Sequence, residues 1–161
     1  MMKMDSTLDF SSAEWAAVVR ADALRALDED VQDGDLTASL IDADRRAVAR
    51  VVARESAVLC GIPWVEAVVR HLAPDARITW HVEEGARCAP DQVVLELAGA
   101  ARALLTAERT ALNFLQLLSA VATKTALHVD AVRGTRARIV VTRKTLPGLR
   151  LAQMYAVRPG G

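Results

Sequence analysis

The hydrophobic pattern changes once along the 161-residue chain, near residue 100, and this change constrains the fold more than any single motif. Before it, short alternating or apolar segments predict strands at 46–55, 57–60, 77–83 and 92–97. Helices are expected between them, one starting at a capping box at 11–14 and one from Pro63 to about Leu72. After the change, leucines recur at helical intervals. The first hundred residues are therefore expected to form an antiparallel sheet with helices, and the remainder a different unit.

The second unit follows the order helix, strand, polar loop and helix, which opens repeating β/α folds. Its first helix, from Ala100, is expected to break at 119–123 and to resume as far as Arg133, before Gly134. A β-branched run at 138–142 suits a buried parallel strand, and a helix is expected over 149–157. Because a lone parallel strand leaves its hydrogen-bonding groups without neighbours, we expect this unit to be the truncated start of a larger fold.

Composition excludes several classes of protein. Lysine plus arginine (20) equals aspartate plus glutamate (20), so nucleic acid and membranes are not expected partners. No apolar run reaches the length of a signal peptide core or a membrane span, which favours a cytoplasmic protein. Cys60 and Cys88 show neither metal-ligand nor disulfide-framework spacing.

Two adjacent cations follow the predicted strand at 138–142. Thr142, Arg143 and Lys144 fall at its carboxyl end, where β/α folds place reacting residues. Arginine can hold a carboxylate with two parallel hydrogen bonds, and lysine adds a compact charge for a second anionic group. The pattern favours a site for a polyanionic substrate, although a solvated loop with ordinary surface charges is the alternative.

The sequence gives weaker evidence for a functional role of the other candidate residues. Arg109 lies within the long helix, where an arginine is usually exposed or part of an ion pair. An acidic loop lacks the spacing and the terminal glutamate of a calcium-binding loop, and comprises Glu29, Asp30, Asp33 and Asp35. The histidines have no mutual metal-ligand spacing. No catalytic nucleophile and no metal ligand is therefore assigned within this chain.

Four segments resemble the quinolinate phosphoribosyltransferase family in sequence, order and spacing: EDVQDGDLT (29–37), LCGIPWVEAV (59–68), ERTALNFLQLLSAVAT (108–123) and TRKTLPGLR (142–150). The resemblance implies an α+β N-terminal sandwich domain with an antiparallel sheet, over residues 1–105. Linking helices and the first β/α unit of a truncated α/β barrel would then occupy residues 106–161.

This resemblance implies a reaction and a set of contacts. The family transfers a phosphoribosyl group from phosphoribosyl pyrophosphate to quinolinate, giving nicotinate mononucleotide, pyrophosphate and CO2 for NAD synthesis, with Mg2+. By resemblance, Arg143 and Lys144 bind quinolinate carboxylates, and Thr142 contacts the substrate beside them. Arg109 is the arginine that one subunit lends to the active site of its neighbour in a homodimer.

The chain also departs from the family pattern. Met154 stands where a lysine is usual, and Ala120 where a glycine is usual. In complete members, the residues that hold Mg2+, pyrophosphate and the phosphate group lie beyond the position of Gly161, so the chain alone is expected to be inactive. Two alternatives stay open: a non-catalytic dimerisation or regulatory module, and a molybdate-locus relative of the same fold that acts on another substrate.

Overall fold

A computed structural model describes residues 9–31 and 36–161 of the chain, and its elements have an α+β arrangement. In chain order they are α1 (Ala13–Val31), α2 (Leu36–Ser39), β1 (Arg46–Val52), β2 (Ala57–Val58), α3 (Ile62–Leu72), β3 (Arg77–Trp80), β4 (Arg87–Cys88), β5 (Val93–Ala100), α4 (Ala101–Val132) and α5 (Arg150–Val157).

The strands form an antiparallel sheet in the order β1-β5-β3, with a separate two-stranded ribbon of β2 and β4. Glu96 in the central strand β5 faces Arg50 of β1 on one side and Thr79 of β3 on the other. The sequence predicted the strands of the larger sheet and its antiparallel sense. It missed β4, which lies in the connection between β3 and β5, because two residues are too short to show a period.

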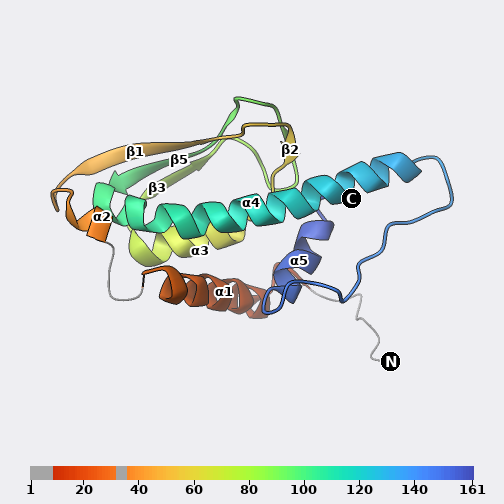
Figure 1. Cartoon of the computed structure of the whole chain (residues 1–161), viewed down its shortest axis with the longest axis horizontal. Helices are drawn as coiled ribbons and strands as arrows, with labels where there is room; N and C mark the ends of the chain where they lie inside the picture. The colour runs from red at the N-terminus through yellow and green to blue at the C-terminus, as the bar shows by residue number, and fades with distance from the viewer. Residues whose placement is uncertain (1–8, 32–35) are drawn as a thin grey trace.

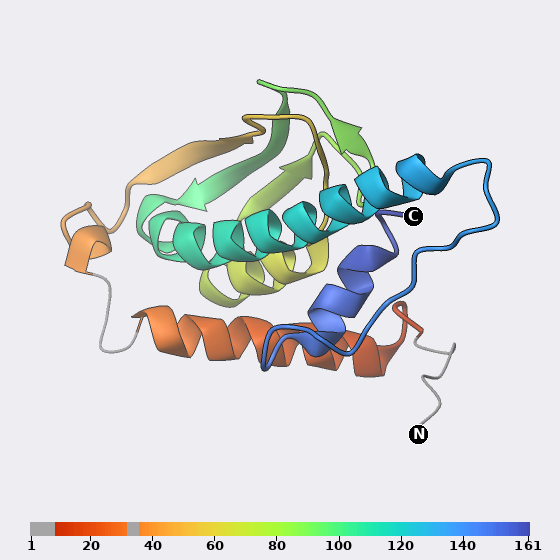
Figure 2. The same cartoon turned by 45° about the vertical axis from the view of Figure 1, so that its right-hand side comes forward.

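The sheet, the pair α3 and α4, and the helix α1 lie in successive layers (Figures 1 and 2). Helix α3 is wedged between α1 and α4, and its residues Trp64, Val65, Val68 and Val69 are all buried. Their spacing of one, three and four residues puts them on one side of a helix, which is why this short segment folds against the core. Helix α5 docks beside α1 and α4.

Helix α4 is continuous from Ala101 to Val132, so the expected break at 119–123 is wrong. The polar side chains there bond to the extended chain that passes alongside. Ser119 Oγ donates to the carbonyl of Cys60 (3.1 Å) and accepts from its N–H (3.0 Å). Thr123 Oγ1 accepts from the N–H of Val58 at 2.9 Å. These hydroxyls therefore replace a missing strand neighbour while the backbone of α4 stays helical.

The strand expected at 138–142 is also wrong. This segment is extended coil that runs back from the end of α4 towards α5 (Figure 1). Ile139 is 40% exposed and Val140 is 73% exposed, although their side chains suit a buried strand. A strand is stable only when its backbone N–H and C=O groups pair with a neighbouring strand. No described strand lies beside this segment to pair with it. The second unit is thus a partial α/β unit that keeps its helix, α5.

Candidate functional site

The candidate cationic segment lies between the long coil after α4 and the first turn of α5. The Thr142 hydroxyl accepts a hydrogen bond from the N–H of Lys144 at 3.3 Å, which bends the chain at Arg143. Leu146 N–H donates to the side chain of Gln153 in α5 at 2.7 Å. Arg143 and Lys144 are exposed, and among the described residues neither forms an ion pair. Their charges are therefore available to an anion.

The second half of this segment rests on α1. A pocket of about 360 Å3 lies between residues 145–151 and the side chains of Val18 and Asp22. Asp22 is buried and accepts hydrogen bonds from Arg25 (2.6 Å) and from the indole N–H of Trp64 (3.3 Å). The Pro-Gly turn at 147–148 is consequently held against a fixed surface, whereas the cations before it remain in solvent.

Arg109 lies on α4 and contacts the other end of α1. Its Nη1 donates to Asp30 Oδ1 at 2.9 Å, while the arginine side chain stays 71% exposed. Asp30 and Asp22 are eight residues apart in α1, which separates them by about 12 Å along the axis. Residues 145–151, which follow the cations, instead lie against Val18 and Asp22. A single copy of the chain therefore leaves the two cationic features apart.

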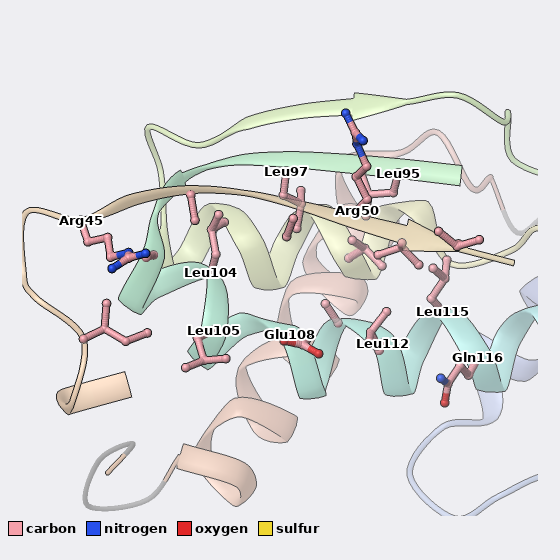
Figure 3. Close-up of a pocket in the computed structure, with 18 of the residues that line it drawn as sticks. Arg45, Arg50, Leu95, Leu97, Leu104, Leu105, Glu108, Leu112, Leu115 and Gln116 are labelled. Atoms are coloured by element: carbon pink, nitrogen blue, oxygen red, sulfur yellow. The ribbon is translucent and has the colours of Figure 1, made fainter. Parts of the chain in front are cut away.

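A groove of about 860 Å3 separates the sheet from α4 (Figure 3). Its floor is apolar and includes Leu95, Leu97, Leu104, Leu112 and Leu115. Its margins carry polar and charged side chains, namely Asp42, Arg45, Arg50, Arg54, Glu108 and Gln116. The sequence shows these residues as ordinary strand and helix positions, so it gave no sign that sheet and helix stand apart at this point.

Position 109 lies on α4 just outside the set of residues that line this groove. Positions 109 and 116 are seven residues apart, which places them within about 20° of each other around the axis of α4. Gln116 lines the groove, as do Glu108 and Leu112. The guanidinium itself is held by Asp30 of α1, which does not line the groove.

A half-buried carboxylate that the sequence did not single out joins three parts of the fold. Glu84 accepts hydrogen bonds from the N–H groups of Gly61 (2.9 Å) and Ile62 (3.0 Å), at the start of α3. Burial, reinforced by the charge of Glu84 and a hydrogen bond to it, raises the pKa of the Cys60 thiol. The same causes raise the pKa of the Tyr155 phenol in α5. Both groups therefore stay protonated, and Glu84 links α5 to the N-terminal layers.

The described residues offer no metal centre. Residues 9–31 and 36–161 contain no group of three or more His, Cys, Asp or Glu side chains arranged to hold a metal ion. Asp33 and Asp35 of the acidic loop lie outside the described residues. In the same ranges, no helix is long and apolar enough to cross a membrane.

The fold and the exposed cations define an α+β protein with a candidate anion-binding segment, and comparison with known proteins identifies the family. Family models of the N-terminal and C-terminal domains of quinolinate phosphoribosyl transferase match residues 35–119 and 121–161. The chain belongs to the quinolinate phosphoribosyl transferase family.

Named relatives agree with this assignment. A nicotinate-nucleotide pyrophosphorylase (carboxylating) of Mycobacterium leprae is 45% identical over 141 residues, which cover 85% of this chain and 50% of that protein. A quinolinate phosphoribosyltransferase (decarboxylating) of Nicotiana tabacum is 36% identical over 138 residues, covering 84% of this chain and 39% of that protein. The chain thus spans about half the length, or less, of these relatives.

Solved structures show the same fold. The nicotinate-nucleotide pyrophosphorylase of Francisella tularensis superposes with a TM-score of 0.87 at 39% identity, over 91% of this chain and 52% of that one. The layers described above are therefore those of the family's N-terminal sheet domain, followed by part of its α/β unit.

Proposed function

We propose that this chain binds quinolinate and takes part in its conversion, with phosphoribosyl pyrophosphate, to nicotinate mononucleotide, pyrophosphate and CO2 in the cytoplasm. The observation that carries the proposal is the pair Arg143 and Lys144, exposed and without an ion pair among the described residues, in a chain of this family. The names of the relatives support the reaction.

The chemistry of the pair suits a pyridine dicarboxylate. The fork of Arg143 can hold one carboxylate through two hydrogen bonds, and the ammonium of Lys144 can meet the second. Thr142 lies beside them, with its hydroxyl bonded to the backbone of Lys144. Fixed positive charge next to the ring would also stabilise the negative charge that develops when a carboxylate leaves as CO2.

Mg2+ belongs to this proposal as the partner of phosphoribosyl pyrophosphate. When bound, it would neutralise charge on the pyrophosphate leaving group. The proposed contacts of Arg143 and Lys144 with quinolinate use only the charges of these two side chains and do not depend on the metal ion.

We further propose that the site is completed across a homodimer. In one copy, Arg109 is held by Asp30 near the end of α1, whereas residues 145–151, which follow the cations, lie against Val18 and Asp22 of the same helix. A second copy seated on this groove would pack against α4 next to position 109. The apolar floor of the groove supports such an interface, because exposure of a contiguous apolar surface to water is unfavourable.

Binding of quinolinate tests the function most simply. In isothermal titration, the wild-type chain is expected to bind quinolinate at least about tenfold more tightly than nicotinate, which has one carboxylate fewer. The double variant Arg143→Ala, Lys144→Ala is expected to lose this preference, whereas Arg136→Ala, an exposed arginine in the same coil, should retain it.

Equal affinity for the two pyridine acids in the wild-type chain would refute the proposed function. Dimer formation without any response to quinolinate would favour the dimerisation module. Melting temperatures of all variants serve as the control for folding.

A further inference from the structure

The ion pair between Asp30 and Arg109 is reinforced by the neighbouring residue. Asp30 Oδ1 accepts from Arg109 Nη1 at 2.9 Å, and Asp30 Oδ2 lies 3.3 Å from the hydroxyl of Thr110. Thr110 is buried and Asp30 is only 23% exposed, so the carboxylate is fixed from the side of the protein while Arg109 faces solvent. Both oxygens are used, which sets the direction from which Arg109 is held.

The location of Asp30 is unfavourable for a carboxylate unless a cation accompanies it. Asp30 lies in the last turn of α1, which contains acidic residues and no basic one. The negative end of the helix dipole opposes acids there. Arg109 comes from another helix, 79 residues away in sequence, to supply the missing positive charge.

The bond to Asp30 leaves most of the guanidinium unused. Within residues 9–31 and 36–161, Nε and Nη2 of Arg109 have no hydrogen-bond partner. These two groups form one edge of the planar fork, with the spacing that a carboxylate accepts as a pair of parallel bonds. An arginine held through one nitrogen keeps its other edge in a defined orientation, so less rotamer freedom is lost when an anion binds.

We propose that Asp30 is a positioning residue for substrate recognition: it fixes the exposed Arg109 guanidinium so that its free edge receives a carboxylate of the substrate. This inference rests on the proposed function for the choice of quinolinate as the ligand. Asp30 itself does not touch the substrate, and its effect acts through Arg109 alone.

A double-mutant cycle separates this role from a general structural one. Quinolinate affinity is measured by titration for the wild-type chain, Asp30→Ala, Arg109→Ala and the double variant. We expect Asp30→Ala to weaken binding about tenfold in the wild-type background and by less than about twofold when Arg109 is already alanine. Asp28→Ala, which removes an exposed acid from the same end of α1, should leave the affinity unchanged.

The variants should fold, because alanine favours a helix and an acid is removed from its unfavourable end. Equal weakening by Asp30→Ala in both backgrounds would show a structural role and overturn the proposal. Tighter binding by Asp30→Ala would show that Asp30 competes with the substrate, and would overturn it as well.

A second measurement keeps the inference separate from the proposed function. The side-chain Nε–H of Arg109, identified by its loss in Arg109→Lys, should give the 15N relaxation of a rigid group in the wild-type chain and of a mobile one in Asp30→Ala. If the wild-type chain shows no response to quinolinate, the proposed function fails and this signal decides the positioning claim. Identical relaxation in both proteins would overturn it.

Discussion

At the scale of single residues, the Glu84 carboxylate shows how one side chain can connect distant segments. It caps α3 through two backbone N–H groups and, with burial, keeps Cys60 and Tyr155 protonated. Tyr155 also stacks on Trp15, with ring centroids 5.3 Å apart. Through these contacts the helix that follows the cationic segment is tied to the first helix of the chain.

These contacts predict a loss of stability at alkaline pH. Burial first, then Glu84, raises the pKa of both groups in the folded chain, whereas unfolding returns the thiol to its ordinary pKa of 9.0 and the phenol to 10.0. Above these values the unfolded chain binds fewer protons than the folded one, so the free energy of unfolding should be constant below about pH 8 and fall as the pH rises further. Urea unfolding at pH 7 to 11 measures this.

Tyr155→Phe is the matched variant, since it removes one of the two titrating groups and keeps the ring. Its free energy of unfolding should fall less steeply than that of the wild-type chain above pH 10. Parallel curves for the two proteins would contradict the assignment.

The sequence allowed some of the important residues to be predicted, but not all of them. The segment at 142–144 was recognisable as a candidate because two adjacent cations follow a predicted strand, whereas Arg109 was assigned a role only through the family resemblance. Glu84 was not, because the N–H groups it caps lie more than twenty residues earlier in the chain. No local spacing relates an acid in a turn to the start of a distant helix.

At the scale of elements, the tight docking of the chain after α5 makes a steric prediction. A methyl group at Gly160 would overlap the carbonyl oxygen of Ala122 and lie 2.6 Å from Thr125 Cβ, both on α4. Gly160→Ala is therefore expected to lower the free energy of unfolding by about 3 kcal/mol. Gly134→Ala serves as a control, because nothing lies within 4 Å of its added methyl. Its positive φ should cost only about 1 kcal/mol. Equal losses in urea unfolding would contradict the packing.

Elements were predictable where their own side chains determine them. The helix α3 and the strand β5 follow directly from the spacing of apolar residues. The two errors, a break in α4 and a strand at 138–142, both depend on neighbours. Ser119 and Thr123 look like helix breakers until the extended chain that uses their hydroxyls is present. The β-branched run at 138–142 has the propensity for a strand but no described partner to pair with.

At the scale of the whole molecule, the open groove beside Arg109 and the exposed cations of 142–144 are two halves of a proposed site that one copy keeps apart. The resemblance to a known family indicated Arg109 and the cations of 142–144 from sequence. The groove itself was not predictable, because its width depends on how the sheet and α4 diverge rather than on any local pattern.

Complementation between defective copies tests the proposed shared site most directly. Arg109→Ala and the double variant Arg143→Ala, Lys144→Ala would carry different tags, be refolded together, and be purified as mixed dimers. Each variant alone should bind quinolinate much more weakly than the wild-type chain. The mixed dimer contains one site with every proposed contact, and should bind about one quinolinate per dimer in a calorimetric titration. A mixed dimer that binds none, or either parent variant that binds like the wild-type chain, would contradict a quinolinate site shared between two copies.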